Sequence, residues 1–294
     1  MRHRLALSLL ALLTALLGAL VVVVTPTSYA DEPARESGGA LPQLPTSPEG
    51  DPPGANDWDC TPTAKRPTPV ILVHGTGGDR KHLLERLSRT IKRRGFCVYS
   101  LDYGNRGLED IKDSAHELKR YTRRVLRATG AEKVSMVGHS QGGMMPRYYL
   151  KFLGGKKKVD DLIGISPSNH GTALTESGNP IGDLVNQLLD VPCRACVQQG
   201  AGSPFLTRLN RGDETPGRVS YTQITTRYDE VVVPHTSGYL AEGPRTTNLT
   251  VQDLCPLAVP EHLTMPLATP TIDIVLDALT HRGPADPKVT PRCL

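Results

Sequence analysis

The segment VSMVGHSQGGMM, residues 134–145, constrains the fold more than any other part of the sequence. Its first half is apolar, as expected of a buried strand, and it runs directly into Ser140 between Gly138 and Gly142. Glycines at these two positions let a strand and the following helix approach closely, so that the serine hydroxyl between them stands exposed. The segment therefore predicts a strand–nucleophile–helix turn. A Gly-rich turn with an incidental serine would have the same sequence, so the surrounding sequence must distinguish the two interpretations.

Apolar runs alternate with helical periodicity from residue 70 onward. Continuous apolar runs are typical of parallel strands buried on both faces. The alternation predicts an α/β fold, with a mostly parallel central sheet and helices on both faces. Functional side chains are then expected beyond the carboxyl ends of the strands. The expected strands are 70–73, 96–102, 134–139, 162–166, 220–226 and 247–255, and the expected helices are 83–91, 111–126, 142–152 and 272–279.

The first 30 residues are typical of a secretory signal peptide. Two arginines precede an apolar run over 5–24, and Ser28 and Ala30 are small residues at the positions that a signal peptidase reads. An uncleaved membrane anchor is the alternative, because the run approaches the ~20 residues that span a bilayer. We expect cleavage after Ala30 and a secreted, extracellular protein with no stable membrane span.

The rest of the chain predicts one catalytic domain with an insertion. Residues 31–59 are rich in Pro, Gly and Asp and predict an extended leader before the domain at 60–294. Residues 171–204 interrupt the alternation, which predicts a small cap over the site, either a mobile lid or a packed surface excursion. Without the two signal-peptide arginines, 32 of the 34 Lys and Arg remain against 30 Asp and Glu. This net charge of +2 argues against a nucleic-acid partner.

All six cysteines follow the expected cleavage site. An even number in an exported protein predicts three disulfides, and of the many possible pairings we expect the sequential one. The Cys193-Arg-Ala-Cys196 segment also fits a redox motif, but it lacks the strand-to-helix setting of such motifs. No histidine lies at zinc-ligand spacing from it, so we expect no zinc site there. The sequence also has no calcium-site signature, and we expect no metal. The expected pairs are Cys60–Cys97, Cys193–Cys196 and Cys255–Cys293.

A serine hydroxyl becomes a nucleophile when a base, normally a histidine oriented by a carboxylate, takes its proton. At a turn of this type the chain order is serine, acid, histidine. Asp229 follows the strand at 220–226 directly and is the predicted acid, with Glu230 as a close competitor. His262 lies on a loop after the last expected strand and is the predicted base. Weaker candidates are Asp183, Asp190, Asp213 and Asp253 for the acid, and His170, His235 and His281 for the base.

Acyl transfer also needs backbone N–H groups directed at the oxygen of the tetrahedral intermediate. One normally belongs to the residue after the serine, which is Gln141. The other comes from the loop after an earlier strand, and the sequence HGTGG at 74–78 supplies it. Thr76 is the expected donor there, and its hydroxyl could add a third bond, while His74 is expected to shape the loop. A phosphate-binding glycine loop fits less well, because the P-loop lysine is missing.

Five segments in this order resemble the secreted lipases of the α/β-hydrolase superfamily: PVILVHGTGG, VSMVGHSQGG, VDDLIGISPSNHGT, YDEVVVP and EHLTM. They are similar to the bacterial class 2 lipases and to the fungal lipase B type, and the resemblance covers roughly residues 60 to 294. It implies an α/β-hydrolase fold and favours the pairs Cys60–Cys97 and Cys255–Cys293. The Cys193–Cys196 loop has no counterpart that we can match. The implied roles are nucleophile for Ser140, acid for Asp229, base for His262, and oxyanion donors for Thr76 and Gln141.

The resemblance implies a secreted carboxylic-ester hydrolase, most consistent with a triacylglycerol lipase that forms an acyl-enzyme. Its partner would be a lipid or another ester, at a lipid–water interface, and we expect a monomer without a cofactor. An exported acyltransferase, in which an alcohol replaces water, is one alternative. The other is a catalytically silent hydrolase fold used for binding. The leucines of residues 181–189 either line an acyl-binding entrance or belong to the core.

Overall fold

The computed structural model describes residues 50–173 and 193–293. The expected signal peptide, most of the leader and the greater part of the 171–204 insertion, with the leucines of 181–189, lie outside these residues. The chain divides into two units, Met1–Gln43 and Leu44–Leu294, and everything described below belongs to the second. None of the helices formed by the described residues is long and apolar enough to cross a bilayer.

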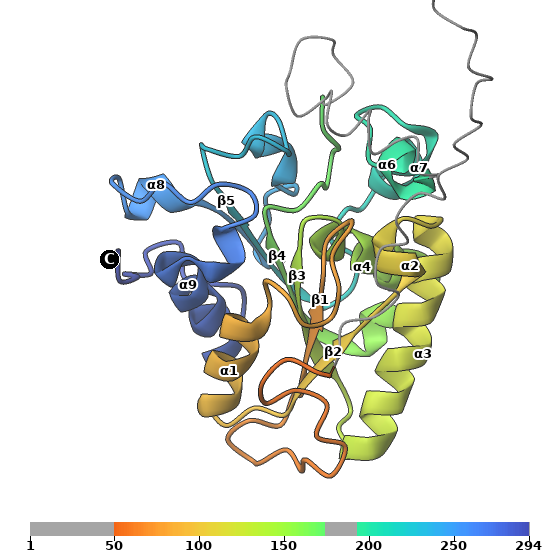
Figure 1. Cartoon of the computed structure of the whole chain (residues 1–294), viewed down its shortest axis with the longest axis vertical. Coiled ribbons are helices and arrows are strands. Elements are labelled where there is room, and N and C mark those ends of the chain that lie inside the picture. The colour runs from red at the N-terminus through yellow and green to blue at the C-terminus, as the bar shows by residue number, and fades with distance from the viewer. Residues whose placement is uncertain (1–49, 174–192, 294) are drawn as a thin grey trace, which may run out of the picture. The chain divides into compact units, whose positions relative to one another are not determined.

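A parallel sheet with the strand order β2-β1-β3-β4-β5-β6 forms the centre of the fold (Figure 1). Its strands are almost entirely buried, which explains why they appear in the sequence as continuous apolar runs. The order reverses direction between β1 and β3, and ligand sites of open α/β sheets lie beyond the strand ends at such a point. The strands are β1 (Val70–Val73), β2 (Val98–Leu101), β3 (Val134–His139), β4 (Val159–Ile165), β5 (Ser220–Thr225) and β6 (Thr246–Thr250).

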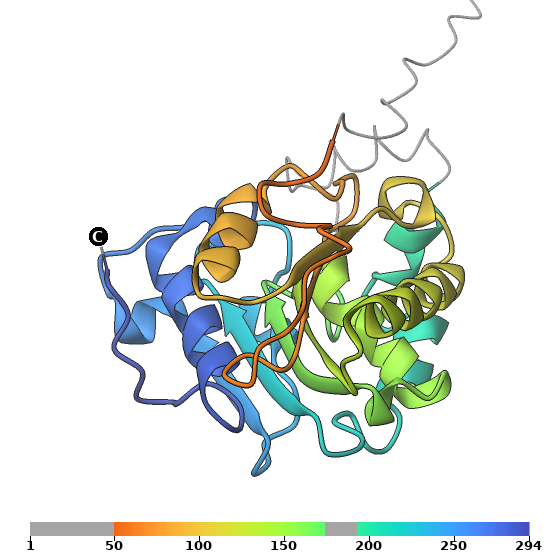
Figure 2. The same ribbon diagram turned by 90° about the horizontal axis from the view of Figure 1, so that it is seen from below.

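Helices cover both faces of the sheet, as the alternation predicted. Helices α1 (Glu85–Arg93) and α9 (Thr269–Thr280) lie on one face, and α3 (Ile111–Thr129) and α4 (Gln141–Phe152) lie on the other (Figures 1 and 2). Each face has its own hydrophobic cluster. The short elements are α2 (Gly104–Gly107), α6 (Arg194–Gln198), α7 (Pro204–Asn210), α8 (Val251–Leu254), and the 3-10 turns η1 (Gly155–Lys157), η2 (His235–Gly238) and η3 (Met265–Leu267).

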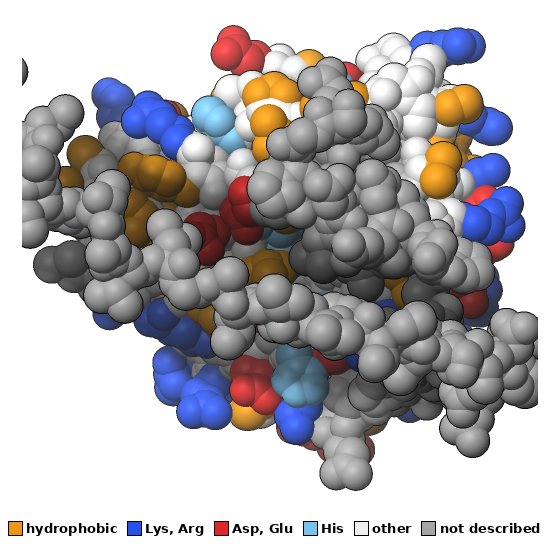
Figure 3. Space-filling view, turned by 45° about the horizontal axis from the view of Figure 1, so that its top comes forward, with side chains coloured by type: hydrophobic (Ala, Val, Ile, Leu, Met, Phe, Trp, Pro, Cys, Tyr) orange, Lys and Arg blue, Asp and Glu red, His pale blue; other side chains and the backbone are white. Residues whose placement is uncertain are grey.

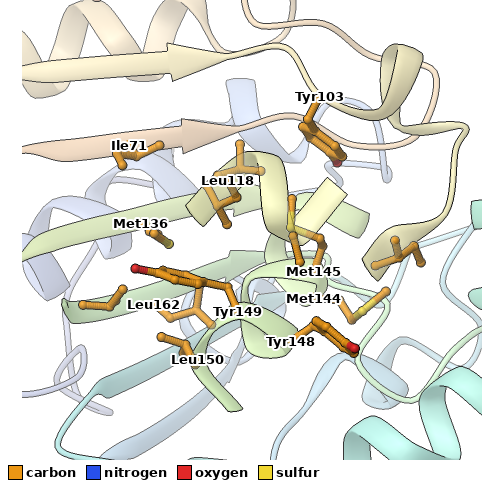
Figure 4. Packing of buried hydrophobic residues seen from close by; sticks show 14 of the residues in the cluster. Ile71, Tyr103, Leu118, Met136, Met144, Met145, Tyr148, Tyr149, Leu150 and Leu162 are labelled. Atoms are coloured by element: carbon orange, nitrogen blue, oxygen red, sulfur yellow. The ribbon is translucent and has the colours of Figure 1, made fainter. Parts of the chain in front are cut away.

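Helix α4 is buried on nearly all sides. Its side chains Met144, Met145, Tyr148 and Tyr149 lie among side chains of the neighbouring strands and of α3 (Figure 4). Burying an apolar side chain of this size stabilises the fold by about 1.5–3 kcal/mol. Because α4 begins directly after Ser140, this packing holds the helix that supports the predicted nucleophile.

The described end of the leader is attached to the edge of the sheet. The backbone N–H of Asn56 donates to the carbonyl of Val98 at 2.9 Å, and the Asn56 side chain hydrogen-bonds to both backbone groups of Ser100. Strand β2 is an edge strand, so these contacts satisfy backbone groups that would otherwise be unpaired.

Three disulfides join the cysteines in sequential order: Cys60–Cys97, Cys193–Cys196 and Cys255–Cys293. The first ties residue 60 to the start of β2, and the third ties the end of α8 to the carboxyl-terminal segment. These two close loops with sequence separations of 37 and 38, whereas the second closes a single turn with a separation of 3. A longer loop loses more entropy in the unfolded chain when it is closed.

The sequence-based assignment of a strand over 247–255 is wrong in its second half. Strand β6 ends at Thr250, and Val251–Leu254 forms the helical turn α8, closed by a 2.8 Å bond from the Cys255 N–H to the Val251 carbonyl. The apolar letters fit both patterns, because residues four apart, such as Val251 and Cys255, lie on the same face of a strand and of a helix. Helices α6 and α7 were not predicted: α6 lies within the 171–204 insertion that broke the alternation, and α7 begins at its last residue.

Candidate active site

Ser140 lies at the junction of β3 and α4 with φ 55° and ψ −125°. Positive φ is unfavourable for a residue with a side chain, and such strain persists only where the surroundings enforce it. A Cβ atom on Gly138 would lie 1.9 Å from the Gly142 carbonyl oxygen, and one on Gly142 would lie 2.3 Å from the His74 carbonyl oxygen. Only glycine fits at either position, which is the close approach that the sequence predicted.

Asp229 and His262 meet at the carboxyl ends of β5 and β6. His262 Nδ1 lies 2.9 Å from Asp229 Oδ1 and 3.0 Å from Oδ2, and the two side chains are only 3% and 1% exposed. A histidine that donates its Nδ1 proton to a carboxylate keeps Nε2 available as the basic nitrogen. The pair therefore has the arrangement of a base with its orienting acid.

Asp229 is held in its charged form. Burial alone would raise the pKa of this carboxyl, but it accepts a hydrogen bond from His262 and a 2.7 Å bond from the Val232 N–H, and these hold the pKa below its ordinary value. The neighbouring Glu230 accepts from the backbone N–H of His262 at 3.1 Å instead of contacting the imidazole. Geometry thus separates the two candidate acids that the sequence left close together.

His139 links the turn at Ser140 to the loop of His262. Its Nε2 donates to the His262 carbonyl at 2.9 Å, and the two ring centroids are 4.8 Å apart. Burial lowers the pKa of His139 to about 3, and the nearby His262 adds to this effect, so the ring is neutral near neutral pH. The His139 bond therefore joins the turn at Ser140 to the loop of His262.

The other side of Ser140 is a network of neutral groups. The Thr76 hydroxyl donates to Gln141 Oε1 at 3.0 Å, and Gln141 Nε2 donates to the Gly107 carbonyl at 3.0 Å. Gln199 Nε2 lies 2.9 Å from Thr76 Oγ1 and 3.1 Å from Gln141 Oε1. The structure thus brings the two predicted oxyanion donors together, and it adds Gln199, which no motif in the sequence indicated.

A turn of left-handed backbone supports the Thr76 loop. Asn105 and Arg106 of α2 have φ values of 45° and 61°, so this turn differs from an ordinary α-helix. The Arg106 backbone carbonyl accepts from the Gly77 N–H at 2.7 Å, and its guanidinium donates to the Gly77 carbonyl at 2.6 Å from Nη2 and 3.0 Å from Nε. His74 also shapes the loop: its Nδ1 donates to the Gly75 carbonyl at 2.7 Å.

The weaker candidates lie elsewhere. Asp183 and Asp190 are outside the described residues. Asp253 pairs with Arg227, and Asp213 accepts from the Thr215 N–H. The remaining histidines are His170, which contacts Glu214, His235, which packs against Tyr239, and His281, which contacts Asp277. Among the described residues, 50–173 together with 193–293, no group of three His, Cys, Asp or Glu side chains is placed to hold a metal ion.

Comparison with solved structures agrees with this architecture. Lipase B of Aspergillus fumigatus superposes with a TM-score of 0.65 at 23% identity, over 81% of this chain and 57% of that one. The mature form of the lipase BlEst2 of Bacillus licheniformis superposes with a TM-score of 0.57 at 17% identity, over 75% of this chain and 94% of that one. At these identities the likeness shows the fold, which is that of the α/β-hydrolases.

Sequence comparison finds curated relatives over shorter stretches. A triacylglycerol lipase of Pseudarthrobacter phenanthrenivorans is 37% identical over 86 residues, 27% of this chain and 27% of the relative. One of Burkholderia plantarii is also 37% identical over 86 residues, 27% of this chain and 24% of the relative. The matches thus span about a quarter of the relatives' length. The sequence model of the class 2 lipase family, in contrast, matches residues 67–260, which include Ser140 and Asp229. This chain therefore belongs to the class 2 lipase family and has the α/β-hydrolase fold that its motifs predicted.

Proposed function

We propose that this chain hydrolyses carboxylic esters of lipids, as a triacylglycerol lipase does, with Ser140 as nucleophile. The observation that carries the proposal is the buried Asp229–His262 pair, which lies at the same end of the sheet as the strained turn at Ser140. A serine at such a turn and a histidine oriented by a carboxylate are the parts that acyl transfer requires.

The proposed reaction has two steps. His262 Nε2 takes the Ser140 proton as Oγ attacks the ester carbonyl, and it then gives this proton to the leaving alcohol. In the second step His262 takes a proton from water as the water oxygen attacks the acyl-enzyme. His262 then returns this proton to Ser140 Oγ as the fatty acid leaves. Asp229 stays ionised and stabilises the imidazolium that forms in both steps.

The backbone N–H groups of Gln141 and Thr76 are the proposed donors to the oxyanion. Gln141 is the first residue of α4, where backbone N–H groups have no partner within the helix and the helix dipole favours negative charge. Donors that are already in place cost no reorganisation when the charge develops, which is the reason why they lower the barrier.

Apolar side chains around the site support a lipid ester as substrate. Of the large hydrophobic side chains that are exposed, several lie on the two loops that carry Asp229 and His262, and Leu257 is 91% exposed. Hydrophobic side chains lie beside acidic and histidine side chains on the face shown in Figure 3. Where such side chains are contiguous, they are typical of interaction sites. The residues are Tyr228, Val233, Leu257, Val259 and Leu263.

Secretion is part of the proposal. Disulfides persist in oxidising compartments, and three of them join the described domain. Together with the signal-peptide pattern of residues 1–30, they support an extracellular enzyme. We further propose that it acts as a monomer without a cofactor.

Fatty-acid release by residues 31–294 tests the proposal, with Ser140→Ala as the control and equal thermal stability as the check that the variant folds. The substrates are an emulsified long-chain triacylglycerol and a soluble short-chain ester. Ser140-dependent release from the emulsion supports a lipase, and release from the short ester alone indicates an esterase. Labelling of Ser140 by a fluorophosphonate without release from either ester would point to acyl transfer. Failure of both assays would contradict the proposal and favour a binding role.

A further inference from the structure

The side-chain amide of Gln199 lies where the proposed reaction needs precise geometry. Gln199 directly follows α6 and is buried. Its Nε2 lies 2.9 Å from Thr76 Oγ1 and 3.1 Å from Gln141 Oε1, and its Oε1 accepts from the Ser168 hydroxyl at 2.8 Å. One amide thus contacts both proposed oxyanion residues and the loop that follows β4.

The direction of these hydrogen bonds follows from the groups at the end of the network. The Gly107 carbonyl can only accept, so Gln141 must turn its Nε2 toward Gly107 and its Oε1 toward Thr76 and Gln199. An oxygen there requires donors, so Gln199 must present its nitrogen. The assignment does not depend on distinguishing the nitrogen from the oxygen of either amide.

Gln199 is held firmly by its own segment. Its backbone N–H donates to the Ala195 carbonyl at 3.0 Å, and its carbonyl accepts from the Thr172 N–H at 3.1 Å. The segment is closed at its start by the Cys193–Cys196 disulfide and is joined to α2 through the Ala195 N–H and the Leu108 carbonyl, 3.1 Å apart. Rigid support of this kind lets a side chain hold its partners in place.

We propose that Gln199 is a positioning residue that frees the Thr76 hydroxyl to donate to the oxyanion; this inference rests on the function proposed above. The hydroxyl has one proton, which is directed at Gln141 Oε1 in this structure. When the proton turns toward the oxyanion, Gln141 Oε1 keeps the Gln199 amide as its donor, so no buried acceptor is left unsatisfied. Donation from Gln199 to Thr76 Oγ1 also polarises the hydroxyl and makes it a stronger donor.

The test replaces Gln199 with methionine, which keeps the length of the side chain and removes the donor. Loss of one oxyanion donor costs roughly 100-fold to 1,000-fold in kcat. Because the Gln199→Met variant keeps the Thr76 hydroxyl but disturbs its orientation, we expect kcat for a soluble short-chain ester to fall about tenfold. KM should change less than about twofold, and Ki for a boronic acid, whose adduct mimics the tetrahedral intermediate, should rise by about the same tenfold factor.

Gln198→Met is the matched control. Gln198 is the neighbouring residue, but its amide accepts from the Ile111 N–H at 2.8 Å and donates to Asp110 Oδ1 at 2.9 Å, so it joins the same segment to α3. We expect this variant to lose thermal stability, because both Gln198 hydrogen bonds join the segment to α3. Its kcat should stay within about twofold of the unmodified chain, a difference of less than about half a kcal/mol in the activation free energy. An equal loss of kcat in both variants would mean that the segment acts only as structural support, and would overturn the inference.

A double-mutant cycle with Thr76→Val tests whether Gln199 acts through the hydroxyl. Thr76→Val keeps the backbone N–H, and we expect it alone to lower kcat about 100-fold. Adding Gln199→Met to Thr76→Val should then lower kcat by less than about twofold, because coupled residues are not additive. A full tenfold further loss would overturn the inference while leaving the proposed function intact. Absence of Ser140-dependent hydrolysis by the unmodified chain would overturn the proposed function, and the inference with it.

Discussion

The two sides of Ser140 differ in chemistry. On one side, Asp229 and His262 form a buried pair in which His262 gains and loses a proton during the proposed reaction while Asp229 stays ionised. On the other, Thr76, Gln141 and Gln199 form a network of hydroxyl and amide groups that do not titrate. The first side can therefore transfer protons, whereas the second can only present dipoles to the developing charge. The difference separates two requirements of acyl transfer, proton transfer and charge stabilisation, onto different loops.

Changing the acid should have the largest effect in this comparison. Asp229→Asn leaves the shape of the site intact but removes the charge that orients and stabilises protonated His262, so we expect kcat to fall about 10,000-fold. Steady-state kinetics on a soluble ester measures the loss. Glu230→Gln is the matched control, because Glu230 contacts only the backbone of His262. We expect this control to lose less than about tenfold in kcat, because the glutamine side chain keeps an oxygen that can accept from the His262 backbone N–H. The reverse order of the two variants would mean that Glu230 is the acid.

The disulfides offer a second contrast between the two sides. Cys255–Cys293 precedes the loop of His262 and closes a long loop, whereas Cys193–Cys196 supports Gln199 and closes a single turn. Replacing both cysteines of the long loop by alanine should lower the free energy of unfolding by about 4 kcal/mol, and the same change in the short loop by less than about 2 kcal/mol. Urea unfolding measures both values. A larger loss at the short loop would show that its contribution is not mainly loop entropy.

The shape of the pH profile should distinguish the sides. Thr76→Val is expected to lower kcat/KM about 100-fold at every pH, because the group that it removes does not titrate. Asp229→Asn should instead change the shape of the profile, because it alters the surroundings of His262. The measurement is kcat/KM from pH 5 to 9. A changed shape for Thr76→Val would mean that the oxyanion side is coupled to proton transfer.

Acid unfolding should show the smallest effect. The folded pKa of Asp229 is below its ordinary value, so its charged form stabilises the folded state above the ordinary value near 3.8. This contribution is lost as the pH falls from there through the folded pKa. The Asp229→Asn variant lacks this stabilisation. The difference in unfolding free energy between the unmodified chain and the variant should therefore narrow below about pH 4. Urea unfolding at several pH values tests this, and a constant difference would contradict it.

Local patterns in the sequence predicted much of the fold and part of the site. The strand at 134–139, the glycines around Ser140 and the order of the acid and the histidine are all features of short segments or of chain order. Such features survive in the sequence because they depend on backbone conformation and on where a strand ends.

The groups that support Thr76 and Gln141 had no such signal. The α2 turn places residues with side chains at positive φ, which no propensity predicts, and Gln199 is one of two adjacent glutamines after the Cys193–Cys196 loop. Gln198 faces α3 and Gln199 faces Thr76, although both are glutamines and no sequence pattern distinguishes them. Only the orientation of α6 decides which of them reaches the site.

The sequence by itself determined the class of fold, the family and the identity of the residues at the strand ends. Those properties follow from hydrophobic periodicity, glycine positions and chain order, which are local. The tertiary structure decided that Asp229, and not Glu230, contacts the imidazole, and that Gln199 joins Thr76 and Gln141. A hydrogen bond depends on distances of a few tenths of an ångström between segments far apart in the chain, and packing alone sets these distances.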